Sequence, residues 1–245
     1  MPSLRFRFSG FIKERIMRFY GVPFSRFQLE PALVPYLPRH RPITLVDVGA
    51  SEGAFTDAVD RHCGVRRGLL VEPQPLNHQR LANRFDSSRF SVEACALSDA
   101  PGEAEMMILN FHYSSSLLSP REEFIASSGG KFAVKDRVTV PVATLDGILE
   151  KLAWTDRIDL LKLDVQGTEL QTLRGAVISL AKTKMVWVEV SFRPMYEHST
   201  LFSEIYDFMR AHSFQLCALQ EGFKSATGEL LQADALFSSV AVTSR

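Results

Sequence analysis

The chain of 245 residues has only three cysteines, no long apolar run and no net charge. The three cysteines, Cys63, Cys95 and Cys217, lie far apart in the sequence. This argues against a disulfide framework, and the short spacings of a metal site are absent. Because such sparse cysteine use is typical of a reducing compartment, we expect a cytoplasmic location. No apolar stretch approaches the roughly 18 residues of a membrane-spanning helix. The N-terminus also lacks the apolar region and cleavage site of a secretory signal.

The balanced charge conceals a basic N-terminal stretch. Its charged residues are Arg5, Arg7, Lys13, Arg15, Arg18 and Arg26, against the single acid Glu14. Apolar side chains lie between them at near-helical spacing, and two interpretations stay open. One is a helix packed on the core, and the other is a basic amphipathic element, residues 1–26, that contacts an anionic membrane or a partner. We therefore separate a helical or basic extension, residues 1–42, from a domain over residues 43–245.

The most informative segment is an apolar strand that turns through glycines into a helix. Ile43–Val48 is predicted to be a buried parallel strand, which breaks at Gly49, and a helical stripe begins after Gly53. Such a turn lets a ligand approach the N–H groups at the helix N-terminus. A second apolar strand ends at Glu72, about 20 residues beyond the glycines, which is the spacing of a ribose-binding carboxylate. The pattern predicts a nucleoside cofactor at the carboxyl edge of a parallel sheet.

From Ile43 onward, apolar strands and helical patterns alternate, which predicts a doubly wound α/β sheet. The expected strands are Ile43–Val48, Gly68–Glu72, Phe90–Ala96, Ile158–Asp164, Met185–Val190, Phe214–Leu219 and Ala235–Val242. An insertion at about residues 100–140 separates the third strand from the fourth. It carries two short strand patterns and the serine cluster Ser114–Ser116. A long polar excursion of this kind is typical of a lid or binding loop.

Five segments in this order resemble one family. They are Val46–Gly53, Val71–Pro75, Ala96–Asp99, Thr144–Asp146 and Leu161–Glu169. Together they are similar to the FkbM-type methyltransferases, a branch of the class I S-adenosylmethionine-dependent enzymes, and the resemblance runs from about residue 43 to 240. It implies an α/β fold, the class I methyltransferase (Rossmann-like) seven-stranded sheet, with helices on both faces and the last strand antiparallel. It also implies S-adenosyl-L-methionine as the cofactor.

The resemblance assigns a cofactor role to residues at the ends of several strands. They are Asp47, Gly49, Ala50, Ser51, Gly53, Glu72, Pro73, Ser98, Asp99 and Asp164. Asp47 suits the ammonium group of the cofactor, directly or through water, and Glu72 suits both ribose hydroxyls. Ser98 and Asp99 are expected beside the adenine, although Asp99 also suits a turn because aspartate favours local hydrogen bonds there.

Asp164 is the principal catalytic candidate, because it ends the strand where this fold brings the methyl group and the acceptor together. His112 and His198 are alternative bases, since histidine titrates near neutral pH. Each histidine is equally compatible with a solvated loop. Gln166 stands where many family members carry an acid, which weakens any role that needs a carboxylate there, and we predict no metal site.

The resulting prediction is an S-adenosylmethionine-dependent methyltransferase acting on a hydroxyl of a sugar or secondary-metabolite-type molecule, such as a polyketide-like alcohol. One alternative is a scaffold that binds the cofactor without catalysis. Another is an NAD-dependent oxidoreductase, but its GxGxxG pattern and a tyrosine–lysine pair are not found. A nucleic-acid substrate is not expected, because the chain has no basic excess.

Overall fold

Four apolar parallel strands form the centre of the fold in the computed structural model, which describes residues 29–225 and 227–240. They are β1 (Ile43–Val48), β2 (Val65–Val71), β7 (Ile158–Leu163) and β8 (Thr183–Ser191). Nearly all their residues are buried, as expected for parallel strands covered on both faces. The two interpretations of the basic stretch fall on residues 1–28, which lie outside the described residues.

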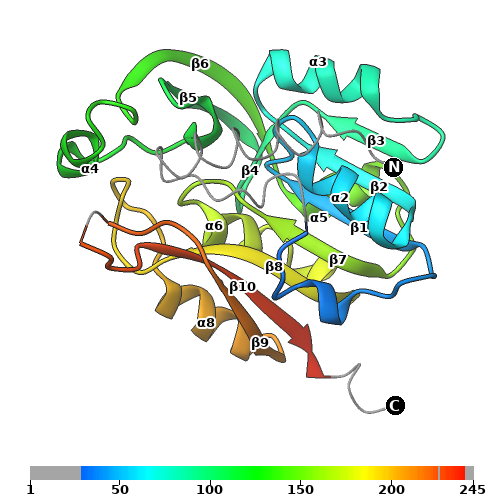
Figure 1. Cartoon of the computed structure of the whole chain (residues 1–245). Coiled ribbons are helices and arrows are strands. Elements are labelled where there is room, and N and C mark those ends of the chain that lie inside the picture. Colours follow the sequence, from blue (N-terminus) through cyan, green and yellow to red (C-terminus); the bar gives the residue numbers. More distant parts are fainter. Residues whose placement is uncertain (1–28, 226, 241–245) are drawn as a thin grey trace, which may run out of the picture.

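The complete main sheet has seven strands in the order β3-β2-β1-β7-β8-β10-β9. The outer strands are β3 (Phe90–Glu93), β9 (Phe214–Glu221) and β10 (Gln232–Ser239). β10 is the last strand along the described sequence, and it runs antiparallel to both β8 and β9 (Figure 1). This arrangement confirms the predicted class I methyltransferase sheet.

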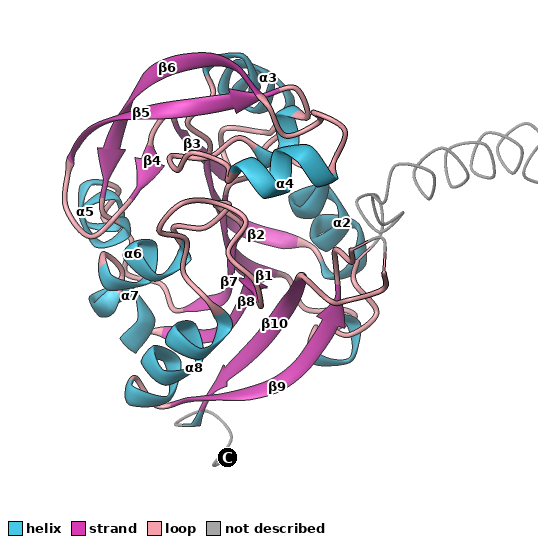
Figure 2. Cartoon of the chain, turned by 90° about the vertical axis from the view of Figure 1, so that its left-hand side faces the viewer, coloured by secondary structure: helices cyan, strands magenta, loops and turns pink. Residues whose placement is uncertain are grey.

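Helices cover both faces of this sheet (Figure 2). The helices α2 (Ala54–Cys63) and α3 (Pro75–Arg84) pack with one apolar cluster, which also contains Leu33 and Leu37 at the two ends of η2 (Val34–Tyr36). The other cluster is covered by α5 (Leu145–Lys151), α6 (Glu169–Arg174), α7 (Val177–Ala181) and α8 (Phe202–Ala211). Successive strand residues face opposite clusters, so Leu160 packs toward α2 whereas Leu161 packs toward α5.

The predicted third strand, Phe90–Ala96, was wrong in its extent. The chain leaves the main sheet after Glu93, and β4 (Ala96–Leu97) pairs instead with a second sheet in the order β4-β6-β5. This small sheet contains β5 (Gly102–Leu109) and β6 (Val134–Ala143), with η3 (His112–Ser114) and α4 (Glu122–Ser127) between them. Both cartoons place β5 and β6 at the opposite end of the molecule from β9 and β10 (Figures 1 and 2).

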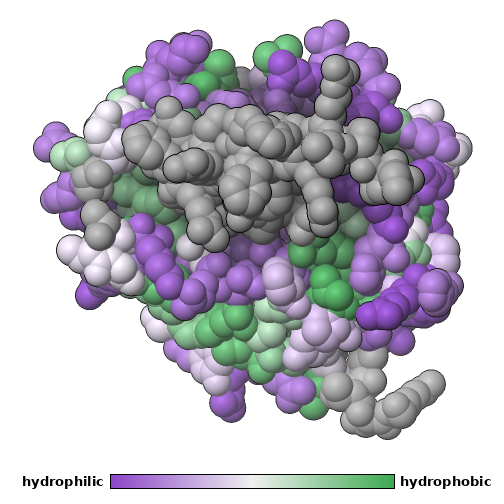
Figure 3. All heavy atoms as spheres, in the orientation of Figure 1, coloured by the Kyte–Doolittle hydropathy of each residue, from purple (hydrophilic) through white to green (hydrophobic). Residues whose placement is uncertain are grey.

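Polar side chains occupy much of the visible face in Figure 3, with apolar ones interspersed. The large apolar residues that are exposed belong to several different elements, among them Leu76, Ile178 and Leu219. Isolated apolar residues of this kind are ordinary on a protein surface. Within residues 29–225 and 227–240, no helix has the length and apolarity needed to cross a membrane.

Candidate functional site

The loop after β1 packs tightly against the ends of its neighbouring strands. Gly49 has a φ of +73°, and a Cβ on it would lie 1.9 Å from the backbone oxygen of Asp164. The N–H groups of Gly49 and Ala50 both donate to the carbonyl of Val71, at 3.0 and 3.1 Å. Glycine is therefore required here by backbone conformation and by the close approach of the end of β7.

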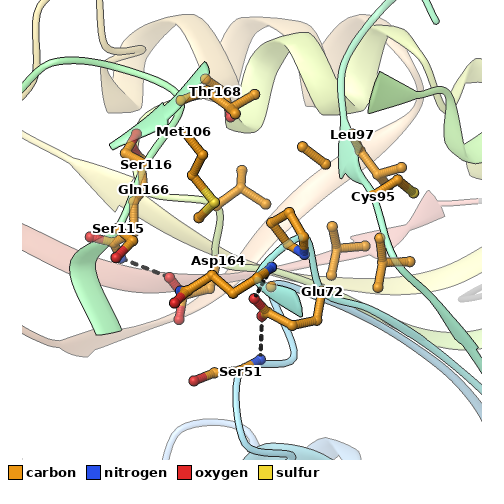
Figure 4. A pocket seen from close by; sticks show the side chains of 18 of the residues that line it. Ser51, Glu72, Cys95, Leu97, Met106, Ser115, Ser116, Asp164, Gln166 and Thr168 are labelled. Atoms are coloured by element: carbon orange, nitrogen blue, oxygen red, sulfur yellow. Dashed lines mark hydrogen bonds between the residues drawn. The ribbon is translucent and has the colours of Figure 1, made fainter. Parts of the chain in front are cut away.

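Glu72 accepts hydrogen bonds from the backbone on two sides. Its side chain receives the N–H of Ser51 at 2.8 Å and the N–H of Gln74 at 2.9 Å (Figure 4). Burial raises the pKa of this carboxyl, whereas the two backbone hydrogen bonds and the nearby Lys162 ammonium lower it. Because each carboxylate oxygen can accept more than one hydrogen bond, Glu72 is a fixed acceptor for a ligand with two hydroxyls.

A pocket opens at this edge of the sheet. Its lining includes five predicted cofactor residues, Gly49, Ser51, Glu72, Pro73 and Asp164, together with the catalytic candidate His112. The remaining cofactor candidates, Asp47, Ala50, Gly53, Ser98 and Asp99, are not among its lining residues. The hydroxyl oxygen of Ser51 is buried without a hydrogen-bond partner in the described structure. An unpartnered hydroxyl at a pocket wall fits a polar ligand.

Ser98 and Asp99 do not reach the pocket wall at the expected adenine position. Cys95, Ala96 and Leu97 line the pocket there. The reason is that the chain leaves the main sheet early, so Ser98 and Asp99 lie beyond the pocket. There the Ser98 hydroxyl donates to the Asp99 carboxylate at 3.2 Å. Their role beside an adenine stays a prediction, and the geometry favours the three preceding residues.

The segment around η3 forms a roof over the pocket. Tyr113 donates to the Glu52 carboxylate at 3.1 Å, and the Gln74 side chain donates to the carbonyl of His112 at 3.4 Å. Ser116 donates to the carbonyl of Gln166 at 2.6 Å. The roof is thereby attached to the loops that follow β1, β2 and β7. The serine cluster contributes to this attachment as well as to the pocket lining.

The structure brings only one of the two candidate histidines to the pocket. His112 lines it, and its ring lies 4.0 Å from that of Tyr113, centroid to centroid. His198 is exposed in a turn after β8, with a φ of +59°, and it is not a lining residue. A general base must reach the proton that it removes. The geometry therefore favours His112 over His198.

Gln166 connects two carboxylates at the end of the pocket that contains Asp164. Its amide nitrogen donates to Asp164 at 2.8 Å and to Glu189 at 2.7 Å. The Tyr196 hydroxyl donates to its amide oxygen at 2.9 Å. An amide supplies two N–H donors without a charge, so this residue holds the two acids in place. Sequence reasoning treated the glutamine only as a lost acid and missed this connection.

Glu169 lies buried beside this group, at the start of α6. Burial raises its pKa to about 7, although hydrogen bonds from the backbone N–H groups of Gly167 and Val165 lower it. The same burial raises the pKa of Tyr196 well above its ordinary value, and the surrounding acids Glu189 and Asp164 add to that effect. Tyr196 is therefore a neutral hydrogen-bond donor at physiological pH.

Asp47 is fully buried beneath the pocket, where it bonds to other protein groups. Its carboxylate accepts from the Thr56 hydroxyl at 2.7 Å and lies 3.2 Å from the Lys162 ammonium. Direct binding of a ligand ammonium by Asp47 stays a prediction, and the geometry favours an indirect role. The cation that lies beside the Asp47 carboxylate is the Lys162 ammonium, which sequence reasoning missed.

Within the described parts of the chain, no group of three or more histidine, cysteine, aspartate or glutamate residues is arranged to hold a metal ion.

The comparisons with known proteins agree with this geometry. The methyltransferase FkbM domain family matches residues 47–216. The 2-O-methyltransferase NoeI of Sinorhizobium fredii (strain NBRC 101917 / NGR234) is 24% identical over 204 residues, which is 80% of this chain and 82% of NoeI. Methyltransferase sdnD of Sordaria araneosa is 28% identical over 153 residues, covering 54% of this chain and 59% of sdnD.

A solved structure shares the fold. The methyltransferase FkbM of Methylobacillus flagellatus KT superposes with a TM-score of 0.54 at 15% identity, over 91% of this chain. The chain spans about half of that protein, 50% of its length.

Proposed function

The chain belongs to the FkbM-domain methyltransferases, and from this premise we propose that it transfers the methyl group of S-adenosyl-L-methionine to a hydroxyl of a sugar or related small molecule. The observation that carries the proposal is the Glu72 carboxylate, held by the N–H groups of Ser51 and Gln74 at the wall of the pocket. A carboxylate so placed is suited to accept both hydroxyls of a ribose.

The residues present fit the cofactor. The unpartnered hydroxyl of Ser51 would bind its polar amino-acid end, and Glu72 would bind its ribose. The apolar wall of Leu97 and Met106 would cover its base. When bound, the cofactor supplies an electrophilic methyl group on a sulfonium.

The protein contributes alignment and proton removal. Fixing two reactants in one pocket can supply about 7–11 kcal/mol in favourable cases, and the roof that closes over the pocket excludes water. A hydroxyl becomes a better nucleophile when its proton is removed as the bond forms. Asp164 is suited to accept that proton, because it lines the pocket and Gln166 holds its carboxylate from one side. His112 is the second candidate for this role.

A hydroxylated acceptor is supported by the chemistry of the pocket end. Asp164 lines the pocket there, and Gln166 holds its carboxylate through an amide N–H group. Ionised carboxylates only accept hydrogen bonds, which favours an acceptor molecule with several hydroxyl donors. The name of NoeI, a 2-O-methyltransferase, supports the same oxygen chemistry.

Calorimetric titration of the purified chain with S-adenosylmethionine, S-adenosylhomocysteine and NAD in parallel tests the proposal. We expect the two adenosyl ligands to bind and NAD not to bind. Incubation with radiolabelled S-adenosylmethionine and a panel of sugars and polyketide-like alcohols then tests the acceptor class. Binding of NAD alone would overturn the proposal, and adenosyl binding without transfer to any alcohol would contradict O-methylation.

A further inference from the structure

The ammonium group of Lys162 lies beneath the pocket, between the ends of β1 and β7. It donates to the carbonyl of Gly49 at 2.8 Å and to that of Val48 at 3.2 Å. It also lies 3.2 Å from the Asp47 carboxylate and 3.7 Å from the Asp164 carboxylate. One side chain therefore contacts both the loop proposed to hold the cofactor and the acid proposed to act on the acceptor.

This ammonium is charged although it is buried. Its side chain is only 9% exposed. Burial lowers the pKa of Lys162, but the attraction of Asp47 and Asp164, with a smaller contribution from Asp234, outweighs that effect and raises it. A buried charge persists only where partners compensate for the lost water. Asp47 supplies that compensation from the partner position on β1, directly opposite Lys162 in the sheet.

We propose that Lys162 is a positioning residue for methyl transfer: its ammonium fixes the Val48–Gly49 turn and holds the Asp164 carboxylate in place. The inference rests on the proposed function of this pocket. It adds a role that neither the residue's place in an apolar strand nor the comparisons assign. The Lys162 ammonium contacts both the turn and the acid, so cofactor binding and the charge beside the acceptor are coupled through it.

Several other groups also influence the Asp164 carboxylate. Those that interact with it, or that lie on its neighbouring elements, are Asp47, Glu72, His112, Glu169, Glu189, Tyr196 and Asp234. Apart from histidine, none of these is a cation, so Lys162 supplies the main favourable charge.

The test uses two ligands and needs no acceptor. S-adenosylhomocysteine is neutral at the sulfur, whereas sinefungin carries a protonated amine at the place of the methyl group. The ratio of their dissociation constants therefore measures the charge that faces the methyl position. Calorimetry at neutral pH gives this ratio.

The informative variant is Asp47→Asn combined with Lys162→Met, because Lys162→Met alone would leave the Asp47 charge buried and uncompensated. It is compared with Asp47→Asn alone, so that only Lys162 differs. We expect the double variant to bind S-adenosylhomocysteine at least about tenfold more weakly, because the turn loses two hydrogen bonds. We also expect the ratio to shift in favour of the cationic sinefungin, because the ammonium that lies 3.7 Å from the Asp164 carboxylate is removed.

Two further variants control for folding. Lys182→Met removes an ammonium that donates to the carbonyl of Trp154 at 2.7 Å, just before β8 at the opposite edge of the sheet. We expect it to leave the ratio unchanged. If the double variant does not fold, as thermal melting would reveal, Lys162→Arg and Lys162→Gln replace it. The arginine variant should keep the wild-type ratio, whereas the glutamine variant should shift it in favour of sinefungin.

The design distinguishes failure of the proposed function from failure of the proposed role of Lys162. A wild-type chain that binds neither ligand would refute the proposed function. A wild-type chain that binds both, with a folded double variant that matches Asp47→Asn in affinity and in the ratio, would refute the role of Lys162 alone.

Discussion

Replacing Glu72 by glutamine should separate ligand recognition from the local fold. The amide keeps one acceptor oxygen, but its NH2 group must face a backbone N–H, either that of Ser51 or that of Gln74. The variant therefore loses at least one charge-assisted hydrogen bond to the ribose, each contributing about 1.5–3 kcal/mol. We expect S-adenosylhomocysteine to bind about 30- to 150-fold more weakly, which corresponds to about 2–3 kcal/mol.

The pH dependence of binding provides a second readout. Burial raises the pKa of Glu72, so its carboxylate is lost on acidification at a higher pH than an ordinary glutamate. Binding that needs the carboxylate should weaken as the pH falls from neutrality, and Glu72→Gln should remove this component. Calorimetry across that range measures both effects. A folded variant that binds within about threefold of wild type, with an unchanged pH profile, would refute the ribose assignment.

Three further predictions concern the loop, the roof and the buried acid. Gly49→Ala should lower the free energy of unfolding in urea by about 2 kcal/mol or more, because its Cβ would clash with the Asp164 carbonyl at positive φ; a smaller loss would mean that the loop relaxes. Tyr113→Phe removes the hydrogen bond to Glu52 and should speed dissociation of S-adenosylhomocysteine several-fold in stopped flow, with an unchanged rate arguing against the roof as a barrier. The pKa of Glu169 is raised from 4.5 to about 7, so the folded state binds an extra proton in this range and the free energy of unfolding should fall as the pH rises from 4.5 to 7. Glu169→Gln should flatten this slope. A slope that persists in the variant would contradict its origin in Glu169.

Local sequence patterns predicted that the glycine turn after β1 and Glu72 after β2 meet at one edge of the sheet. The apolar strand, the glycine turn and Glu72 at the next strand end are all short-range features, and in an open α/β sheet they meet at the carboxyl edge. The structure brings Gly49, Ser51 and Glu72 to one pocket wall. These residues were predictable because strand order and strand ends alone place them.

The rest of the site depends on long-range packing that no local pattern specifies. Ser98 and Asp99 pass the pocket because the chain leaves the main sheet after Glu93, and His198 lies in an exposed turn. Lys162 did leave a signal, since it is a charge between the apolar residues of its strand, as Asp159 is. Its partner Asp47 is likewise buried within β1, but only the sheet register places the two opposite each other.

The separate apolar clusters have a consequence for how such a protein can change over evolutionary time. The main sheet is stabilised by two clusters, whereas β5 and α4 pack into a third, which contains Met107, Phe124, Phe132 and Tyr196. Substitutions without shared partners have nearly additive effects on stability. New residues can therefore accumulate in the segment over the pocket at little cost to the sheet that holds Glu72, so the lineage can explore new acceptors while it retains one methyl donor.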